Sequence, residues 1–142
     1  AKNWLEVGAV NWRGGEDLAA RFSNYSETHV DVFAPGVEMY LPVPDDKYRS
    51  INGTSFAAPA VSGVAALLRS YFPSLTAAQV REIIMDSSIK PKGKVKQPGS
   101  GEMVTFSSLS VSGGMLNAFN AIQAASKVKG KKKTKASKNN IP

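Results

Sequence analysis

Residues 51–63 read INGTSFAAPAVSG, so a glycine and two hydroxyl residues directly precede an alanine-rich apolar run. A serine that acts as a nucleophile needs an exposed Oγ, a base that takes its proton and hydrogen-bond donors for the oxyanion. If a helix begins here, Ser55 lies in its first turn, where the backbone N–H groups have no partner within the helix. The positive end of the helix dipole also favours developing negative charge there. Ser55 is therefore a candidate nucleophile, and its own N–H is a candidate oxyanion donor.

A structural interpretation of the same residues is simpler. Ser and Thr are among the usual N-cap residues, so Thr54 or Ser55 could serve only to cap the helix. Local residue types alone favour this interpretation. Gly53 is compatible with both interpretations, because a residue without a side chain permits a close approach.

Three segments before this serine are typical of strands. The apolar run Val7–Val10 predicts a buried strand, and residues 30–33 predict a second that ends at the turn Ala34-Pro35-Gly36. Residues 38–43 and 48–51 flank the sequence PDDK and predict a hairpin.

The segment that follows the serine predicts two helices of different character. Residues 56–72 carry no charge except Arg69, which predicts a helix that is buried on all sides and stopped by Pro73. Thr76 and Gln79 then have the spacing of a capping box, with Leu75 and Val80 at the positions of a hydrophobic staple. The second helix carries Val80, Ile83 and Ile84 on one stripe, so we expect it to be buried on one side only.

The last third of the chain is less regular. Residues 89–101 are rich in Lys, Pro and Gly and predict an exposed loop, and residues 103–111 fit a strand or a hairpin. After Gly113-Gly114, the spacing of Ala118, Ala121, Ile122 and Ala125 predicts a helix capped by Asn117.

This order of elements predicts a layered α/β protein. Two short strands make too small a parallel sheet to cover a helix that is buried on all sides. We therefore expect a further structural layer, or a partner, on the other side of residues 56–72.

Charge is distributed unevenly along the 142 residues. Seven of the 18 Lys and Arg residues lie in 127–142, which contains no acidic residue, and the rest of the chain holds 11 basic and 11 acidic residues. Such a run predicts a basic, disordered tail. No aromatic residue interleaves these lysines, so we expect no nucleic-acid partner. No apolar run is long enough to span a membrane, and the absence of cysteine excludes disulfides and cysteine metal sites.

The segment INGTSFAAPAVSGVAALL resembles the active-serine segment of the subtilisin-like serine peptidases, the subtilases, whose pattern reads G-T-S-x-A-x-P followed by apolar and small residues. The resemblance extends in order to VGAV, FSNYS, VDVFAPG and PSLTAAQVREIIMDSS, and more weakly to GGMLNAFNAIQAA. Ala60 stands where many members have a histidine that is not the catalytic one, and residues 90–112 depart from the family pattern.

The resemblance implies the C-terminal part of a subtilisin-like three-layer α/β fold. Residues 1–126 would form part of the catalytic domain, with an insertion-like loop at about 90–112, and residues 127–142 would be the tail. In this family the triad runs Asp, His, Ser along the chain. The segments that carry the aspartate, the histidine and the oxyanion-hole asparagine do not occur in this sequence, so it would begin about midway through the domain.

The resemblance also implies a function: hydrolysis of peptide bonds through an acyl-enzyme on Ser55, with Thr54 and Asn52 at the rim of the site. The base and its aspartate would come from the N-terminal part of the same domain, so this chain alone would be inert, and it would bind that part or self-associate. Substrates would be proteins or peptides. No cofactor is required for the chemistry, structural calcium fits the complete domain, and the location would be secreted or periplasmic. The alternative is a degenerate or truncated subtilase that serves as a non-catalytic scaffold or binding module.

The sequence offers two further candidate sites. His29 is the only histidine and lies at the start of a predicted strand, where a surface histidine is the favoured interpretation over a replacement base. Asp31 and Glu27 could contribute to a weak cation site, although a turn or solvated carboxylates are favoured.

Overall fold

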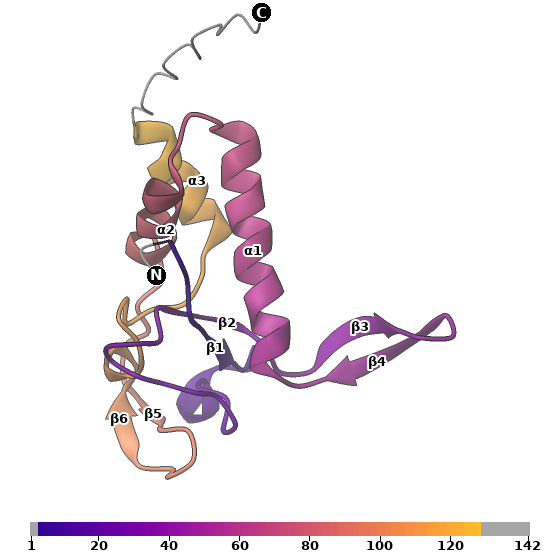
Figure 1. The fold of residues 1–142 in the computed structure, drawn as a ribbon. Coiled ribbons are helices and arrows are strands. Elements are labelled where there is room, and N and C mark those ends of the chain that lie inside the picture. The colour runs from indigo at the N-terminus through magenta and orange to yellow at the C-terminus, as the bar shows by residue number, and fades with distance from the viewer. Residues whose placement is uncertain (1–2, 129–142) are drawn as a thin grey trace, which may run out of the picture.

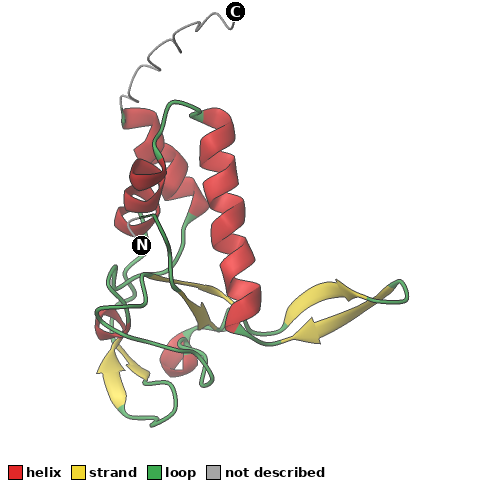
Figure 2. Cartoon of the chain, in the orientation of Figure 1, coloured by secondary structure: helices red, strands yellow, loops and turns green. Residues whose placement is uncertain are grey.

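The computed structural model describes residues 3–128, which form a mixed α/β arrangement. Six strands are present in this range: β1 Val7–Val10, β2 Val32–Pro35, β3 Met39–Val43, β4 Lys47–Ile51, β5 Lys94–Lys96 and β6 Met103–Thr105. Three α-helices accompany them: α1 Thr54–Tyr71, α2 Ala77–Asp86 and α3 Ala118–Lys127. Two short 3₁₀ helices complete the order, η1 Gly15–Asp17 and η2 Phe106–Leu109. The three α-helices lie together on one side of β1 and β2 (Figures 1 and 2).

The parallel pair β1–β2 forms the small sheet on which α1 packs. Val7 lies opposite Val32 and Val10 opposite Pro35, so both strands end at the same edge. On the other side of β2, the Phe33 N–H donates to Gly114 O at 3.0 Å and the Leu116 N–H donates to Phe33 O at 2.8 Å. The predicted strand Val7–Val10 is confirmed, whereas the second begins two residues later than predicted.

Helix α1 packs on this two-stranded sheet through one face. Its buried residues are Ala57, Val61, Val64 and Leu68, which recur at helical spacing and face the core. Ser55, Ser62 and Ala66 are exposed on other faces. Within the described residues only one face of this helix is covered, so burial on all sides, which was expected to need a further layer or a partner, stays a prediction. The helix starts two residues before the predicted residue 56. It also runs without a break through Pro59.

Helices α2 and α3 begin as predicted. The Gln79 N–H donates to Thr76 Oγ1 at 3.2 Å, and the Thr76 N–H donates to Gln79 Oε1 at 2.9 Å, so the capping box is confirmed. The Asn120 N–H donates to Asn117 Oδ1 at 2.7 Å, which confirms Asn117 as the cap of α3.

Residues 89–112 are more structured than predicted. Strands β5 and β6 form an antiparallel hairpin, and η2 follows it directly. Val95 is buried, and the ring of Phe106 lies 5.1 Å from that of Phe33 between centroids. The prediction of an exposed loop over 89–101 is therefore wrong at the hairpin, because Val95 joins a second apolar cluster beneath β2.

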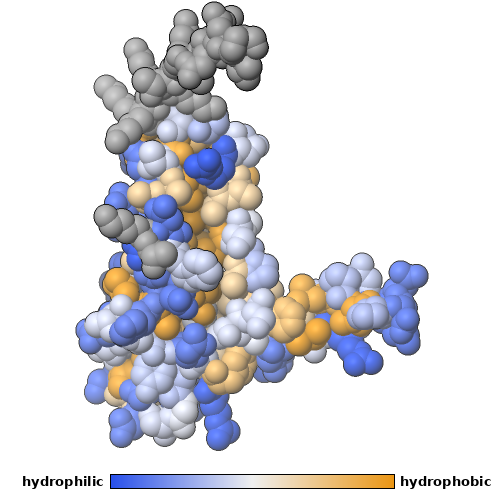
Figure 3. Space-filling model, in the orientation of Figure 1, coloured by the Kyte–Doolittle hydropathy of each residue, from blue (hydrophilic) through white to orange (hydrophobic). Residues whose placement is uncertain are grey.

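The hairpin β3–β4 was predicted and is confirmed, with Met39 opposite Ile51 and Val43 opposite Lys47. It projects away from the rest of the molecule (Figure 1). Tyr40 and Tyr48 are 71% and 59% exposed, and their rings stack with centroids 5.4 Å apart. Figure 3 shows hydrophobic surface along this projecting hairpin.

Nearly all of the predicted basic tail, 127–142, lies outside the described residues. Within residues 3–128, no helix combines the length and the apolar character needed to cross a bilayer.

Candidate active site

The candidate nucleophile lies at the edge where both parallel strands end. The Gly36 N–H donates to Val10 O at 3.1 Å, and the Gly53 N–H donates to Gly36 O at 2.9 Å, which fixes the start of α1 beside the ends of β1 and β2. Open α/β sheets bind their ligands at this carboxyl edge.

The close approach of these two turns depends on glycine. A Cβ added to Gly36 would lie 2.8 Å from Gly53 O and 2.8 Å from the Cβ of Ala9. Those distances are shorter than real carbon contacts, so a side chain at position 36 would push the turn of residue 53 away from the strands. The position of the N-terminus of α1 is thus set by backbone packing.

Gly53 is the N-cap of α1, with Thr54 as the first helical residue and Ser55 as the second. The interpretation of Thr54 or Ser55 as the N-cap is therefore wrong. Because Gly53 has no side chain, no side-chain cap hydrogen bond forms at this terminus. The Phe56 N–H donates to Gly53 O at 3.1 Å. The Ser55 N–H belongs to the first turn, where donors have no partner within the helix.

The side chain of Ser55 is exposed, and its Oγ makes no hydrogen bond with any residue in the range 3–128. Exposure and a free N–H meet two of the three requirements of a nucleophilic serine. The third, a base, is not supplied by the described residues. Ala57, two residues further along the helix, is fully buried in the core.

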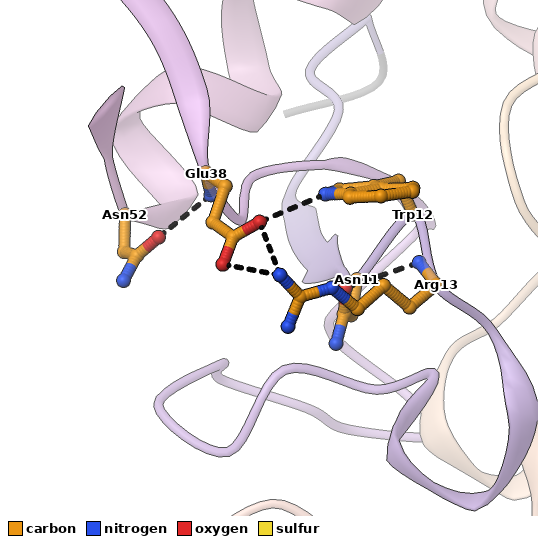
Figure 4. Close-up of polar contacts among 5 residues, drawn as sticks. All are labelled: Asn11, Trp12, Arg13, Glu38 and Asn52. Carbon is orange, nitrogen blue, oxygen red and sulfur yellow. Dashed lines mark hydrogen bonds and ion pairs between the residues drawn. The ribbon is translucent and has the colours of Figure 1, made fainter. Parts of the chain in front are cut away.

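Asn52, the other predicted rim residue, is held by a polar cluster that sequence reasoning missed (Figure 4). Its Oδ1 accepts a hydrogen bond from the Glu38 N–H at 2.7 Å. The Glu38 carboxylate in turn accepts two hydrogen bonds from Arg13 Nη2, at 2.8 and 2.9 Å, and one from Trp12 Nε1 at 3.3 Å. We call Trp12, Arg13, Glu38 and Asn52 the Glu38 clamp.

No sequence signal identified this cluster. Trp12 and Arg13 lie in a segment rich in Gly and charge, and they are 25 or more residues from Glu38 along the chain. Such residues are typical of a solvated loop when they are considered in sequence alone.

His29 makes no hydrogen bond to Ser55 among the described residues. Its exposed ring accepts or shares hydrogen bonds with Thr28 Oγ1 at 2.8 Å and Ser26 Oγ at 3.2 Å, both in its own turn. The interpretation of His29 as a surface histidine is confirmed.

Asp31 is buried and already paired. One carboxylate oxygen accepts from Arg81 Nη2 at 2.5 Å, and the other accepts from the Glu6 N–H at 2.9 Å. The Asp31 carboxylate is therefore neutralised by a guanidinium and is not a solvated carboxylate, and these contacts give the suggested weak cation site no support. Residues 3–128 contain no group of three or more His, Asp or Glu side chains arranged to hold a metal ion.

Comparison with known proteins adds to this geometry. The sequence model of the Subtilase family, a peptidase family, matches residues 1–135. The chain belongs to the subtilase family. Subtilisin DY from Bacillus licheniformis is 44% identical to it over 77 residues, which are 54% of this chain and 27% of that protein. Alkaline elastase YaB from Bacillus sp. (strain YaB) is 38% identical over 99 residues, which are 70% of this chain and 25% of that protein.

Solved subtilase structures agree with the family assignment. The patellamide maturation protease PatA superposes with a TM-score of 0.68 and 27% identity, covering 87% of this chain and 43% of that chain. A structure of the subtilase cytotoxin SubAB gives a TM-score of 0.64 and 28% identity, covering 85% of this chain and 36% of that chain. The chain is thus a mixed α/β unit that matches part of a subtilase protease domain and spans less than half of these relatives.

Proposed function

We propose that this subtilase chain carries the nucleophile of a serine endopeptidase, and that Ser55 is this nucleophile. The observation that supports it most is the start of α1, where Gly53 leaves the first-turn N–H groups uncapped beside an exposed Ser55. A base takes the Oγ proton of Ser55 as the Oγ attacks the scissile carbonyl carbon, and the C–N bond breaks as this proton passes to the leaving amine. Water then hydrolyses the acyl-enzyme and regenerates Ser55. The Ser55 N–H donates to the oxyanion, which the helix dipole also stabilises.

The remaining catalytic groups come from a segment outside this sequence. A general base and its aspartate are needed for Ser55 to lose its proton, and the single histidine of the chain is bonded within its own turn. We place both groups in the N-terminal part of the same catalytic domain. The chain alone is then inert, since removing the base of a subtilisin triad costs about 10⁶-fold in turnover.

The exposed side of α1 supports a covering partner. A groove of about 260 Å³ lies between the N-terminal segment and α1, and it is lined by Trp4, Leu5, Ala58, Val61 and other small residues. Trp4 is 64% exposed there. The N-terminal part of the domain covers this face and completes the three-layer fold, of which this chain is the C-terminal portion. In its absence the chain self-associates through the same face.

The substrates are proteins or peptides, as expected for a subtilase. No cofactor takes part in the proposed steps, and any structural calcium belongs to the complete domain. Export from the cell is part of the proposal and rests on the family alone.

Labelling with a fluorophosphonate probe, followed by peptide mass spectrometry, tests the assignment. We expect the longest natural product that contains this chain to be labelled at Ser55 and the 142-residue chain to remain unlabelled. Ser55→Ala should abolish labelling. Ser62→Ala, which removes another exposed serine from the same helix, should leave it unchanged.

A second candidate is a non-catalytic scaffold or binding module. It is favoured by the lack of a base among the described residues. An unlabelled full-length product, free of any inhibitory segment and with its fold intact, would support the scaffold and contradict the peptidase.

A further inference from the structure

The backbone of Glu38, which is hydrogen-bonded to Asn52 three residues before the proposed active serine, has an unusual conformation. Its φ is 54°, in the left-handed region that favours glycine. A residue with a side chain persists there when its surroundings hold it in place. The contacts of the Glu38 clamp provide that restraint. The left-handed backbone and the hydrogen bonds thus both indicate that Glu38 is held in one conformation.

Three chain segments meet at the clamp, as Figure 4 shows. The first is the turn after β1, in which the Arg13 N–H donates to Asn11 Oδ1 at 3.1 Å. The guanidinium of Arg13 also lies 5.3 Å from the centre of the Trp12 ring. The second segment carries Glu38 into β3, and the third is Asn52 after β4. The clamp therefore ties the end of β1 to both ends of the projecting hairpin.

The hydrogen bond between Glu38 and Asn52 links the clamp to the start of α1. Met39 lies opposite Ile51 in the hairpin, so Glu38 lies opposite Asn52 one step beyond the ladder, and the Glu38 N–H donates to Asn52 Oδ1. Helix α1 begins two residues after Asn52. The clamp thus sets the path along which the chain enters the turn at Gly53.

We infer that Glu38 is a positioning residue for the reaction proposed above. Held by Arg13 and Trp12, it fixes Asn52 and thereby the direction of the Ser55 Oγ and N–H. This inference rests on the proposed function of Ser55. Glu38 does not touch the reacting atoms, so its loss slows acylation and leaves substrate affinity unchanged.

The expected effect is modest because the pair is exposed. The side chains of Arg13 and Glu38 are 60% and 40% accessible, and ion pairs of this kind are weak and screened by salt. We expect loss of the clamp to lower the acylation rate about two- to fivefold.

Glu38→Gly in the full-length product separates positioning from stability. Glycine relieves the left-handed backbone and removes the carboxylate, so the melting temperature should not fall. The rate of fluorophosphonate labelling at Ser55 and kcat should fall about two- to fivefold, with KM unchanged. Glu38→Gln keeps one acceptor for Trp12 or Arg13 and should restore part of the rate.

Asp17→Asn is the matched control. It breaks another exposed ion pair, between Asp17 and Lys96 at 3.1 Å, which has no bond to the clamp. Its labelling rate should equal that of the wild type. The wild-type rate should also fall as NaCl is raised, whereas the rate of Glu38→Gly should not, since an uncharged probe has no salt dependence of its own.

The outcomes are distinguishable. Wild-type labelling at Ser55 with an unchanged rate in Glu38→Gly would overturn the positioning role alone. An equal loss of rate in Asp17→Asn would do the same, because the effect would then be general to surface charge. A full-length wild type that is not labelled at all would overturn the proposed function, and the positioning role with it.

Discussion

Helices α1 and α2 follow one another along the chain and begin in opposite ways. At α2, Thr76 and Gln79 satisfy each other's backbone donors, with distances of 2.9 and 3.2 Å. At α1, Gly53 offers no side chain, and the first-turn donors remain open beside an exposed Ser55. An Asn117 cap also closes α3.

Among the three α-helices of residues 3–128, only α1 lacks a side-chain hydrogen bond at its N-cap. Compared with glycine at the same position, a side-chain cap stabilises a helix by roughly a few tenths of a kcal/mol. A terminus without one keeps its N–H groups available to an external acceptor, such as a developing oxyanion. Stability is thus foregone where the proposed chemistry needs donors and retained elsewhere.

Transferring a cap to α1 should have the largest effect. In Gly53→Asp, the new carboxylate accepts from the N–H groups of Ser55 or Phe56 and adds negative charge where the oxyanion develops. A Cβ at this position would lie 3.3 Å from the Phe56 ring and 3.8 Å from the Ser55 N, so the substitution requires a small shift of the Phe56 ring. We expect fluorophosphonate labelling of Ser55 to slow by about 10²–10³-fold, with the melting temperature unchanged or raised. An unaffected rate would contradict the role of the open terminus.

Removal of the ion pair that attaches α2 to the strands should come next. Asp31 is buried and its partner Arg81 is partly exposed, with side chains 8% and 28% accessible. Arg81→Met leaves a buried carboxylate without its cation and should lower the free energy of unfolding by about 2–3 kcal/mol, measured by denaturant titration. The double variant Asp31→Asn/Arg81→Met should recover part of this loss, because no orphan charge remains. A double variant no more stable than the single one would contradict the explanation.

Removal of the Thr76 side-chain cap of α2 should have a smaller effect, on stability and not on the labelling rate. Thr76→Ala removes the acceptor of the Gln79 N–H and should cost about 1 kcal/mol of stability. The labelling rate at Ser55 should not change, because this terminus is not near the proposed reaction. Gln79→Ala combined with Thr76→Ala should cost less than the sum of the two single changes, since the two residues form one reciprocal unit.

The smallest effect concerns the exposed pair of Lys96 and Asp17, which touches neither helix terminus. A hydrogen bond and the charge of Asp17 raise the pKa of Lys96 above its ordinary value of 10.5. The pair therefore contributes its stabilisation fully below pH 10.5 and loses it as pH rises through the pKa of the folded state. An NMR titration of the Lys96 side chain should show this raised pKa in the wild type and a lower one in Asp17→Asn.

Local patterns predicted the elements whose determinants are local. The capping box at Thr76, the cap at Asn117 and the hairpin around residues 44–47 all depend on residues a few positions apart, and all are confirmed. Burial of α1 on all sides stays a prediction, because Ala58 and Ser62 are exposed among the described residues and the layer expected to cover them is not among those residues.

Features that depend on long-range contacts were missed. Val95 looked exposed among Lys and Gly, yet the cluster with Phe33 and Phe106 buries it. The hydrogen bonds of the Glu38 clamp join residues 14 to 26 positions apart, and nothing in the local sequence distinguishes its charges from solvated ones. The motif around Ser55 predicted where the serine lies, whereas its supporting contacts required the structure.

The two ends of the hairpin β3–β4 lie side by side, paired at Met39 and Ile51 and joined again by the bond from Glu38 to Asn52. The intervening residues make their ladder with one another and project into solvent (Figure 1). Because closure entropy rises by only about 0.6 kcal/mol for each doubling of length, a longer or shorter ribbon can be spliced between these ends at little thermodynamic cost. The hairpin can therefore be replaced by one of another length while its two paired ends, and the start of α1 that follows them, keep their positions. The length of the projecting hairpin can thus change independently of the proposed reaction at Ser55.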